Sequence, residues 1–251
     1  MKTLLHRAKD RGYAEHGWLK THHSFSFASY YDPAKMGFGA LRVLNDDVIA
    51  PGAGFGMHPH DNMEIITIPL SGSLKHEDSM SLPAVTMPGA LLAGNSAVVK
   101  TGEIQVMSAG TGVFHAEYNA SPTEPLSLFQ IWIETAVPGV TPRYDQKRFE
   151  QDAFNGAFVP VVGPIGTEGL LGIHQDAWVS LGQFVAGSEV DYKVREPSHG
   201  VYVMVTFGSV TIGDTVLEAR DAIGITEATE VGVRVDTDAS LLVLEVPMTG
   251  A

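Results

Sequence analysis

Short runs of β-branched and aromatic residues recur along the whole chain, and this pattern constrains its fold more than any other feature. Residues 39–45, 64–70 and 128–134 are examples, bounded by Gly, Pro, Asn or Asp. Such runs between turn residues are typical of β-strands. Apolar residues at helical spacing are almost absent, and a short helix is expected at residues 146–154 alone. The chain is therefore predicted to be all-β, with its strands in a sandwich or barrel, jelly rolls among the options.

The same rhythm of strands occurs in both halves of the 251-residue chain. This length allows one large domain or two modest ones. A segment rich in Pro, Gly and charged residues, 135–158, separates the halves. We therefore expect two related β-domains, residues 1–135 and residues 136–251, of which the second begins with the linker.

Composition excludes several classes of protein. The chain has 16 Lys and Arg against 29 Asp and Glu, a net charge of −13, which opposes binding to nucleic acids or to anionic membranes. No apolar run has the length of a membrane-spanning helix, and residues 1–7 become charged too early for a signal peptide, so a cytoplasmic protein is expected. With no cysteine in the chain, any metal ion must be held by His and carboxylate side chains.

Residues 52–64 contain two histidines two positions apart, His58 and His60. In a strand such side chains point to the same face, so both imidazoles would project into one space. Glu64 would lie on the same side if the strand continued. Because one such pair among ten histidines can arise by chance or lie on the surface, this segment alone is a weak indication of a metal site.

Residues 110–119 repeat this spacing with His115 and Glu117. Two such strands facing each other inside a barrel would supply three imidazoles and a carboxylate. This set suits a divalent Fe, Mn, Co, Ni, Cu or Zn ion without selecting among them. Two same-face pairs make a metal site the favoured interpretation. The second half has only isolated histidines, His174 and His199, and is expected to bind no metal.

The two histidine segments resemble the two motifs of the cupin superfamily. The residues that carry this resemblance are Gly52, His58, His60 and Glu64 in the first motif, and Gly112, His115 and Asn119 in the second. Glu117, two residues after the second-motif histidine, is a mark of the pirin family of bicupins. Further stretches similar to bacterial pirin-like proteins lie at 11–12, 17–19, 23–27, 30–33, 41–47, 63–65, 76–79 and 141–144. The resemblance is dense from about residue 10 to residue 150 and thinner afterwards.

This resemblance implies an all-β bicupin, with two double-stranded β-helix (jelly-roll) domains and a metal ion in the N-terminal one. It implies His58, His60, His115 and Glu117 as ligands, Fe(II) as the first choice of ion, and Glu64 near the metal without being a main ligand. Bacterial members similar to this chain are described as quercetin 2,3-dioxygenases. Eukaryotic pirins are described as iron-dependent transcriptional coregulators.

An octahedral ion with these four ligands would keep two open positions, which is a catalytic rather than a structural arrangement. A flavonol, a small aromatic substrate, could chelate the ion through its 3-hydroxyl and 4-carbonyl oxygens. A nearby carboxylate would then take the hydroxyl proton. We expect Glu117 to be this base and Glu64 to be the alternative. The family resemblance adds dioxygen as the second substrate and ring cleavage with loss of carbon monoxide.

The sequence also suggests roles for residues outside the two motifs. His76 either lies at the pocket rim and binds substrate or belongs to a solvated polar turn. Residues 79–101 are longer and more apolar than the family pattern predicts, so they could cover the pocket mouth, which leaves the substrate open. His22 and His23 are expected to be structural, and Trp132 is expected to be a core residue rather than a substrate platform.

Two other function classes remain open. One is a non-enzymatic regulator whose metal or redox state changes its choice of protein partner. The other is a different metal-assisted reaction, such as isomerisation or hydrolysis. Flavonol turnover would separate the dioxygenase from both, and tight binding to a protein would favour the regulator. The sequence names no such partner.

Overall fold

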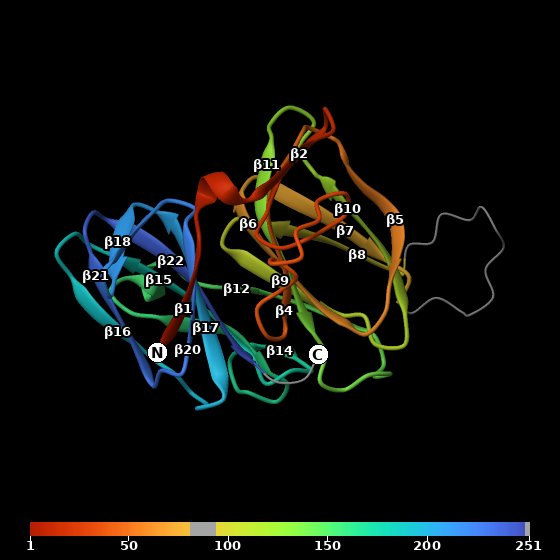
Figure 1. The fold of residues 1–251 in the computed structure, drawn as a ribbon. Coiled ribbons are helices and arrows are strands. Elements are labelled where there is room, and N and C mark those ends of the chain that lie inside the picture. Colours follow the sequence, from red (N-terminus) through yellow and green to blue (C-terminus); the bar gives the residue numbers. More distant parts are fainter. Residues whose placement is uncertain (81–93, 249–251) are drawn as a thin grey trace.

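The computed structural model describes residues 1–80 and 94–248, which form two β-barrels packed side by side (Figure 1). Each barrel consists of a seven-stranded and a four-stranded sheet. Helical structure in the described ranges is limited to two short 3-10 turns, Ala8–Asp10 and Gln151–Phe154. No helix among these residues is long and apolar enough to cross a membrane. The prediction of an all-β chain with two jelly-roll domains is confirmed.

The first barrel carries the paired histidines. Its larger sheet contains, in spatial order, β12 (Arg143–Arg148), β9 (Glu103–Ser108), β6 (Met63–Ser71), β11 (Leu126–Glu134), β4 (Leu41–Ile49), β3 (Leu19–His23) and β2 (Gly12–Glu15). Its smaller sheet contains β5 (Gly54–His60), β10 (Val113–Asn119), β7 (Ser73–Asp78) and β8 (Asn95–Lys100).

The second barrel has the same two-sheet plan. Its larger sheet contains, in spatial order, β1 (Lys2–His6), β20 (Ala222–Thr226), β17 (His199–Phe207), β22 (Ala239–Pro247), β15 (Trp178–Phe184), β13 (Val159–Pro164) and β14 (Leu171–Ile173). Its smaller sheet contains β16 (Glu189–Lys193), β21 (Glu230–Val235), β18 (Ser209–Ile212) and β19 (Thr215–Glu218).

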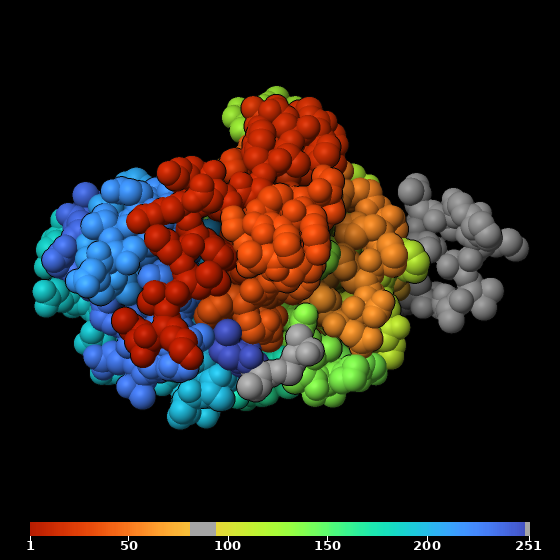
Figure 2. All heavy atoms as spheres, viewed as in Figure 1, coloured from red at the N-terminus to blue at the C-terminus, as the bar shows by residue number. Residues whose placement is uncertain are grey.

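The sheets do not divide the chain at the predicted boundary after residue 135. Strand β1 pairs with β20 of the second barrel, and β12 pairs with β9 of the first. The N-terminal segment therefore lies across the surface of both barrels (Figure 2). The predicted helix at residues 146–154 is also wrong at its start, because residues 146–148 belong to β12 and the 3-10 turn begins at Gln151. Both differences result from pairing between segments distant in sequence.

The two larger sheets pack against each other through an apolar layer. This layer combines residues of both barrels, among them Ile66, Ile68, Phe129, Ile131, Ile173, Leu242 and Leu244. The alternate residues of β6, Ile65 and Thr67, face the inside of the first barrel instead. Because both faces of β6 are covered, residues 65–68 form a continuous apolar and threonine run rather than an alternating one.

The interiors of the two barrels differ in chemistry. The second barrel is filled mostly by apolar side chains, among them Val201, Val203, Val210, Ile212, Val231 and Val233, beside a buried polar group in which Tyr192 and His199 contact Glu245. The first barrel is apolar at one end, where Leu19, Ile49, Leu74, Val99, Leu126 and Leu128 pack together. Above this layer its interior becomes polar, and a site for a charged or metal-bound group is therefore possible in the first barrel.

The contact of β1 with the rest of the molecule predicts a pH dependence of stability. His6 is buried against Phe25 and Tyr202, and its Nδ1 lies 2.8 Å from the Tyr202 hydroxyl. Burial, with smaller contributions from Lys35 and Arg11, lowers the pKa of His6 to about 4. Between that value and the ordinary value of about 6.5, the unfolded state binds the proton more tightly. The imidazole therefore stabilises the fold above pH 6.5, and this contribution is lost as the pH falls towards 4.

We expect the free energy of unfolding to fall by about 2 kcal/mol more between pH 7 and pH 5 in the parent than in His6→Gln. Glutamine retains a polar group beside Tyr202 but does not titrate. Urea unfolding followed by circular dichroism at the two pH values measures the difference. The same pH dependence in both proteins would show that His6 is not responsible.

Candidate metal centre

Three histidine side chains meet inside the first barrel. Strands β5 and β10 are antiparallel neighbours, and their register places His58 directly opposite His115. The ring centroids of His58 and His115 are 4.4 Å apart, and His60 lies 4.8 Å from His115 and 4.9 Å from His58. One nitrogen from each ring lies within 4.8 Å of the others, so all three could bind one ion.

The nitrogens that face this space have no other use in the described part of the chain. His60 Nε2 and both ring nitrogens of His115 are buried without a hydrogen-bond partner. His58 Nδ1 donates to the carbonyl oxygen of Gly56 at 2.7 Å, which leaves the lone pair of Nε2 free. Buried polar atoms are rarely left unpaired in proteins, because their desolvation is costly. Coordination of a metal ion would satisfy these nitrogens.

The surroundings of the histidines favour the neutral imidazole, which is the form that binds metals. Burial lowers the pKa of His115 to about 2, with smaller contributions from its histidine neighbours. Burial also lowers the pKa of His60 to about 4, helped by His58. The edge of the His60 ring meets Trp132, with centroids 4.8 Å apart, and this contact fixes its orientation. Protons therefore compete little with a metal ion for these two side chains near neutral pH.

Glu117 lies two residues after His115 on β10, beyond an irregularity in the pairing with β5. Its Oε1 accepts a hydrogen bond from Gln105 Nε2 at 2.6 Å, and the Thr67 hydroxyl is 3.2 Å away. Its Oε2 accepts from Gln130 Nε2 at 2.7 Å. Three neutral donors thus hold the buried carboxylate in place, as outer partners commonly orient metal-binding side chains.

The donor set fits a divalent metal ion. Glu117 shares a second group of neighbouring ligand atoms with His115 and His76, again within 4.8 Å of one another. His115 therefore joins the three-histidine group to the carboxylate. Three imidazole nitrogens and one carboxylate oxygen suit ions such as Fe, Mn, Ni, Cu or Zn rather than Mg or Ca.

Glu64 lies on the opposite face of the large sheet from these residues, so the expectation that it shares their space is wrong. Strand β5 ends at His60 and β6 begins at Met63, with a turn at Asn62 in the left-handed conformation between them. Glu64 is fully buried, and Ser108 Oγ donates to its Oε2 at 2.6 Å. Burial raises the pKa of Glu64, although its hydrogen bond from Ser108 lowers it.

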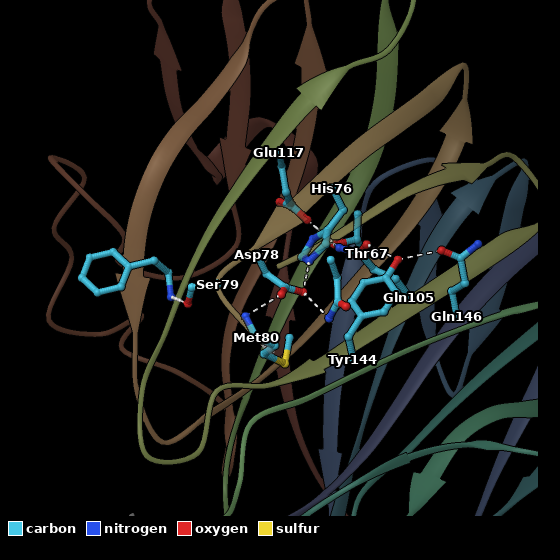
Figure 3. Close-up of polar contacts among 11 residues, drawn as sticks. Thr67, His76, Asp78, Ser79, Met80, Gln105, Glu117, Tyr144 and Gln146 are labelled. Carbon is cyan, nitrogen blue, oxygen red and sulfur yellow. Dashed lines mark hydrogen bonds and ion pairs between the residues drawn. The ribbon is translucent and has the colours of Figure 1, made fainter. Parts of the chain in front are cut away.

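Both predicted positions of His76 are wrong, because this residue lies at neither a pocket rim nor a solvated turn. It is fully buried on β7, where its Nε2 donates to Asp78 Oδ2 at 3.0 Å (Figure 3). Its ring stacks on Tyr144 with centroids 4.5 Å apart and lies 5.5 Å from His115. The Tyr144 hydroxyl donates to Gln146 Oε1 at 2.7 Å. His76 therefore belongs to a polar layer behind the histidine cluster.

A cavity of about 470 Å³ opens beside the histidines, within the range of small-molecule sites. Its lining combines the aromatic residues Trp18, Phe27, Phe55 and Trp132 with His58, His60, His115 and Glu117, and with Thr21, His23, Asn45 and Asp47. Trp132 is therefore more than a core residue, contrary to expectation. His23 lines the cavity as well as packing against Phe27, whereas His22 is exposed.

Sequence reasoning missed the polar residues of this cavity. The alternation of β3 and β4 places four polar residues on the inner face: Thr21, His23, Asn45 and Asp47. This two-residue period is the only sequence feature that points to them. Burial raises the pKa of Asp47 to about 7, and the neighbouring Thr21 hydroxyl opposes this shift. The predicted cover of the pocket mouth falls largely on residues 81–93, which lie outside the described residues. Residues 95–100 form β8 and pair with β7.

Comparison with known proteins gives the family. A family model described as pirin matches residues 5–133, and one described as the quercetinase C-terminal cupin domain matches residues 160–246. Quercetin 2,3-dioxygenase of Escherichia coli K12 is 42% identical over 97% of this chain and 98% of its own length. A pirin-like protein of Caulobacter vibrioides is 40% identical over 93% of this chain and 95% of its own.

Among solved structures, the bacterial pirin YhhW of E. coli in complex with nickel(II) superposes with a TM-score of 0.88. It is 40% identical, and the match covers 99% of this chain and all of that one. The two matched domain models, the identity over nearly the whole length and the shared fold agree with the resemblance of the histidine motifs. The chain belongs to the pirin family.

Proposed function

We propose that the protein is a metal-dependent dioxygenase that cleaves a flavonol such as quercetin, with dioxygen as the second substrate. The observation that carries this proposal is the set of buried imidazole nitrogens without partners, which face an aromatic-lined cavity beside a carboxylate. The names of relatives such as the E. coli quercetin 2,3-dioxygenase support the reaction class.

His58, His60, His115 and Glu117 are the proposed ligands of the ion, and Fe(II) is the proposed ion. When bound, a redox-active ion lowers the pKa of a chelating hydroxyl and provides the site for reaction with dioxygen. The bacterial pirin of E. coli was crystallised with nickel(II), which fits a site that accepts several divalent ions.

The remaining roles belong to the walls of the cavity. Trp18, Phe55 and Trp132 bind the flat face of an aromatic ligand and exclude water from the reacting atoms. Glu117 is the proposed acceptor of the flavonol hydroxyl proton. Three hydrogen bonds already occupy its oxygens, so Oε2, which accepts one of them, is the atom with capacity left for the proton or the ion. Glu64, on the other face of the sheet, is a far weaker candidate.

We expect His58→Ala, His60→Ala and His115→Ala each to lower the metal-to-protein ratio of the purified protein by about tenfold or more. Each substitution removes one nitrogen ligand from a site built around three, while the apolar end of the barrel stays intact. The ratio is measured by inductively coupled plasma mass spectrometry, with circular dichroism as a check of folding.

His22→Ala provides the matched control, because His22 is exposed on the same barrel and faces away from the cavity. It should retain the parent ratio. The triple variant should retain essentially no metal, since both clusters of possible metal ligands among the described residues lie in the first barrel. An unchanged ratio in two of the three single variants would place the metal elsewhere.

Glu117→Gln is expected to lower flavonol oxidation per bound metal by about 10²–10⁴-fold, the usual contribution of a positioned general base. The amide keeps the size of the side chain but loses its charge, and it brings a donor towards the donors Gln105 and Gln130. The metal should weaken yet remain, because three imidazoles still hold it. Dioxygen consumption with quercetin, divided by metal content, gives the turnover.

Glu64→Gln is the comparison, and its turnover per metal should stay near that of the parent. A greater loss in Glu64→Gln than in Glu117→Gln would reverse the two roles. If the fully metallated parent does not oxidise flavonols at all, the dioxygenase proposal is wrong and a regulatory role becomes the better interpretation.

A further inference from the structure

The cavity has a second polar wall that the proposed metal site does not use. It is formed by Thr21 and His23 on β3 and by Asn45 and Asp47 on β4. The two strands are paired so that Thr21 lies opposite Asp47 and His23 opposite Asn45. These strands belong to the larger sheet, whereas His58, His60 and His115 project from the smaller one. A ligand in the cavity would therefore lie between the histidines and this wall.

Three of these four side chains are engaged with one another. His23 Nδ1 donates to Asn45 Oδ1 at 2.9 Å, and the Thr21 hydroxyl lies 3.4 Å from the same nitrogen. Asp47 is different. Its side chain is buried, with 2% of the residue exposed, and although the nearby Thr21 hydroxyl lowers the pKa of its carboxyl group, its Oδ1 has no hydrogen-bond partner in the described part of the chain. A buried acceptor left unpaired costs about 1–3 kcal/mol, and more if it is charged.

No cation within the described ranges pairs with Asp47. The alternation of the strand turns its neighbour Asp46 to the other face, where Asp46 lies 2.7 Å from Arg220 and 3.5 Å from Arg11. The carboxyl group of Asp47 instead shares its cavity with Glu117 and with aromatic rings such as Phe55. A donor that suits this place is neutral and attached to an apolar body, which describes the hydroxyl group of a phenol-like ligand.

We propose that Asp47 accepts a hydrogen bond from a hydroxyl group of the bound aromatic ligand, and that this contact selects hydroxylated compounds over their unhydroxylated counterparts. The inference rests on the proposed function, because it takes this cavity as the substrate site. Asp47 is thus a specificity residue on the wall opposite the metal ligands. The aromatic walls bind any flat ring system, whereas Asp47 increases the affinity for a ring system that carries a hydrogen-bond donor.

The test measures binding rather than turnover, on the metal-loaded protein with dioxygen excluded. Isothermal titration calorimetry gives the Kd of quercetin and of flavone, the same ring system without hydroxyl groups. In Asp47→Leu, which removes both acceptor oxygens at similar volume, the Kd of quercetin should rise about 10–100-fold. The Kd of flavone should change less than about threefold, because flavone has no hydroxyl to lose.

Two further variants separate acceptor chemistry from packing. Asp47→Asn keeps one carbonyl oxygen and should retain most of the quercetin affinity even if Asp47→Leu proves unstable. Asp214→Leu, at an exposed position between β18 and β19, is the matched control and should bind both ligands like the parent.

Equal loss of affinity for quercetin and flavone in Asp47→Leu would overturn the inference while leaving the dioxygenase proposal in place, since Asp47 would then only shape the cavity. Failure of Asp47→Asn to retain affinity would likewise overturn it. If the parent binds neither compound, the cavity is not a flavonoid site, and both this inference and the choice of substrate are wrong, whatever the metal content shows.

Discussion

The pairing of β5 with β10 is the interaction on which the candidate site depends. Its register sets His58 directly opposite His115, and the two-residue period of each strand adds His60 and Glu117 on the inner side. A shift of one residue in either strand would turn its inward side chains to the outside of the barrel. Glu117 follows an irregularity in the pairing after His115, and its carboxylate accepts hydrogen bonds from Gln105 and Gln130.

The rest of the molecule supports this register. The polar layer around Glu117 rests on the apolar end of the barrel, and the larger sheet is covered on its other face by the second barrel. The second barrel has the same plan but a mostly apolar interior, and it buries the outer face of the large sheet. Strand β1 also connects the two barrels, because it pairs with β20 of the second barrel before the chain enters the first.

Local spacing predicts part of this arrangement. It fails where contacts between segments distant in sequence determine the position of a residue. The convergence of His58, His60 and His115 was predictable, because two short periods in two glycine-flanked strands are local features. The spacing does not predict the position of Glu64, because a tight turn at residues 61–62 starts a new strand in the other sheet. The burial of His76 depends on Tyr144, which comes from a strand far along the chain. For Asp47, the alternation of β4 predicts only that the side chain points inward. The sequence does not predict that it faces the histidines of the smaller sheet.

We propose that one divalent ion is held by His58, His60, His115 and Glu117 at the edge of the aromatic cavity. Anomalous X-ray diffraction from crystals of the metal-loaded protein, recorded above and below the absorption edge of the ion, tests it most directly. We expect one strong peak within about 2.0–2.2 Å of three imidazole nitrogens and a Glu117 oxygen. A peak beside other residues, or two peaks of equal strength in the two barrels, would contradict it.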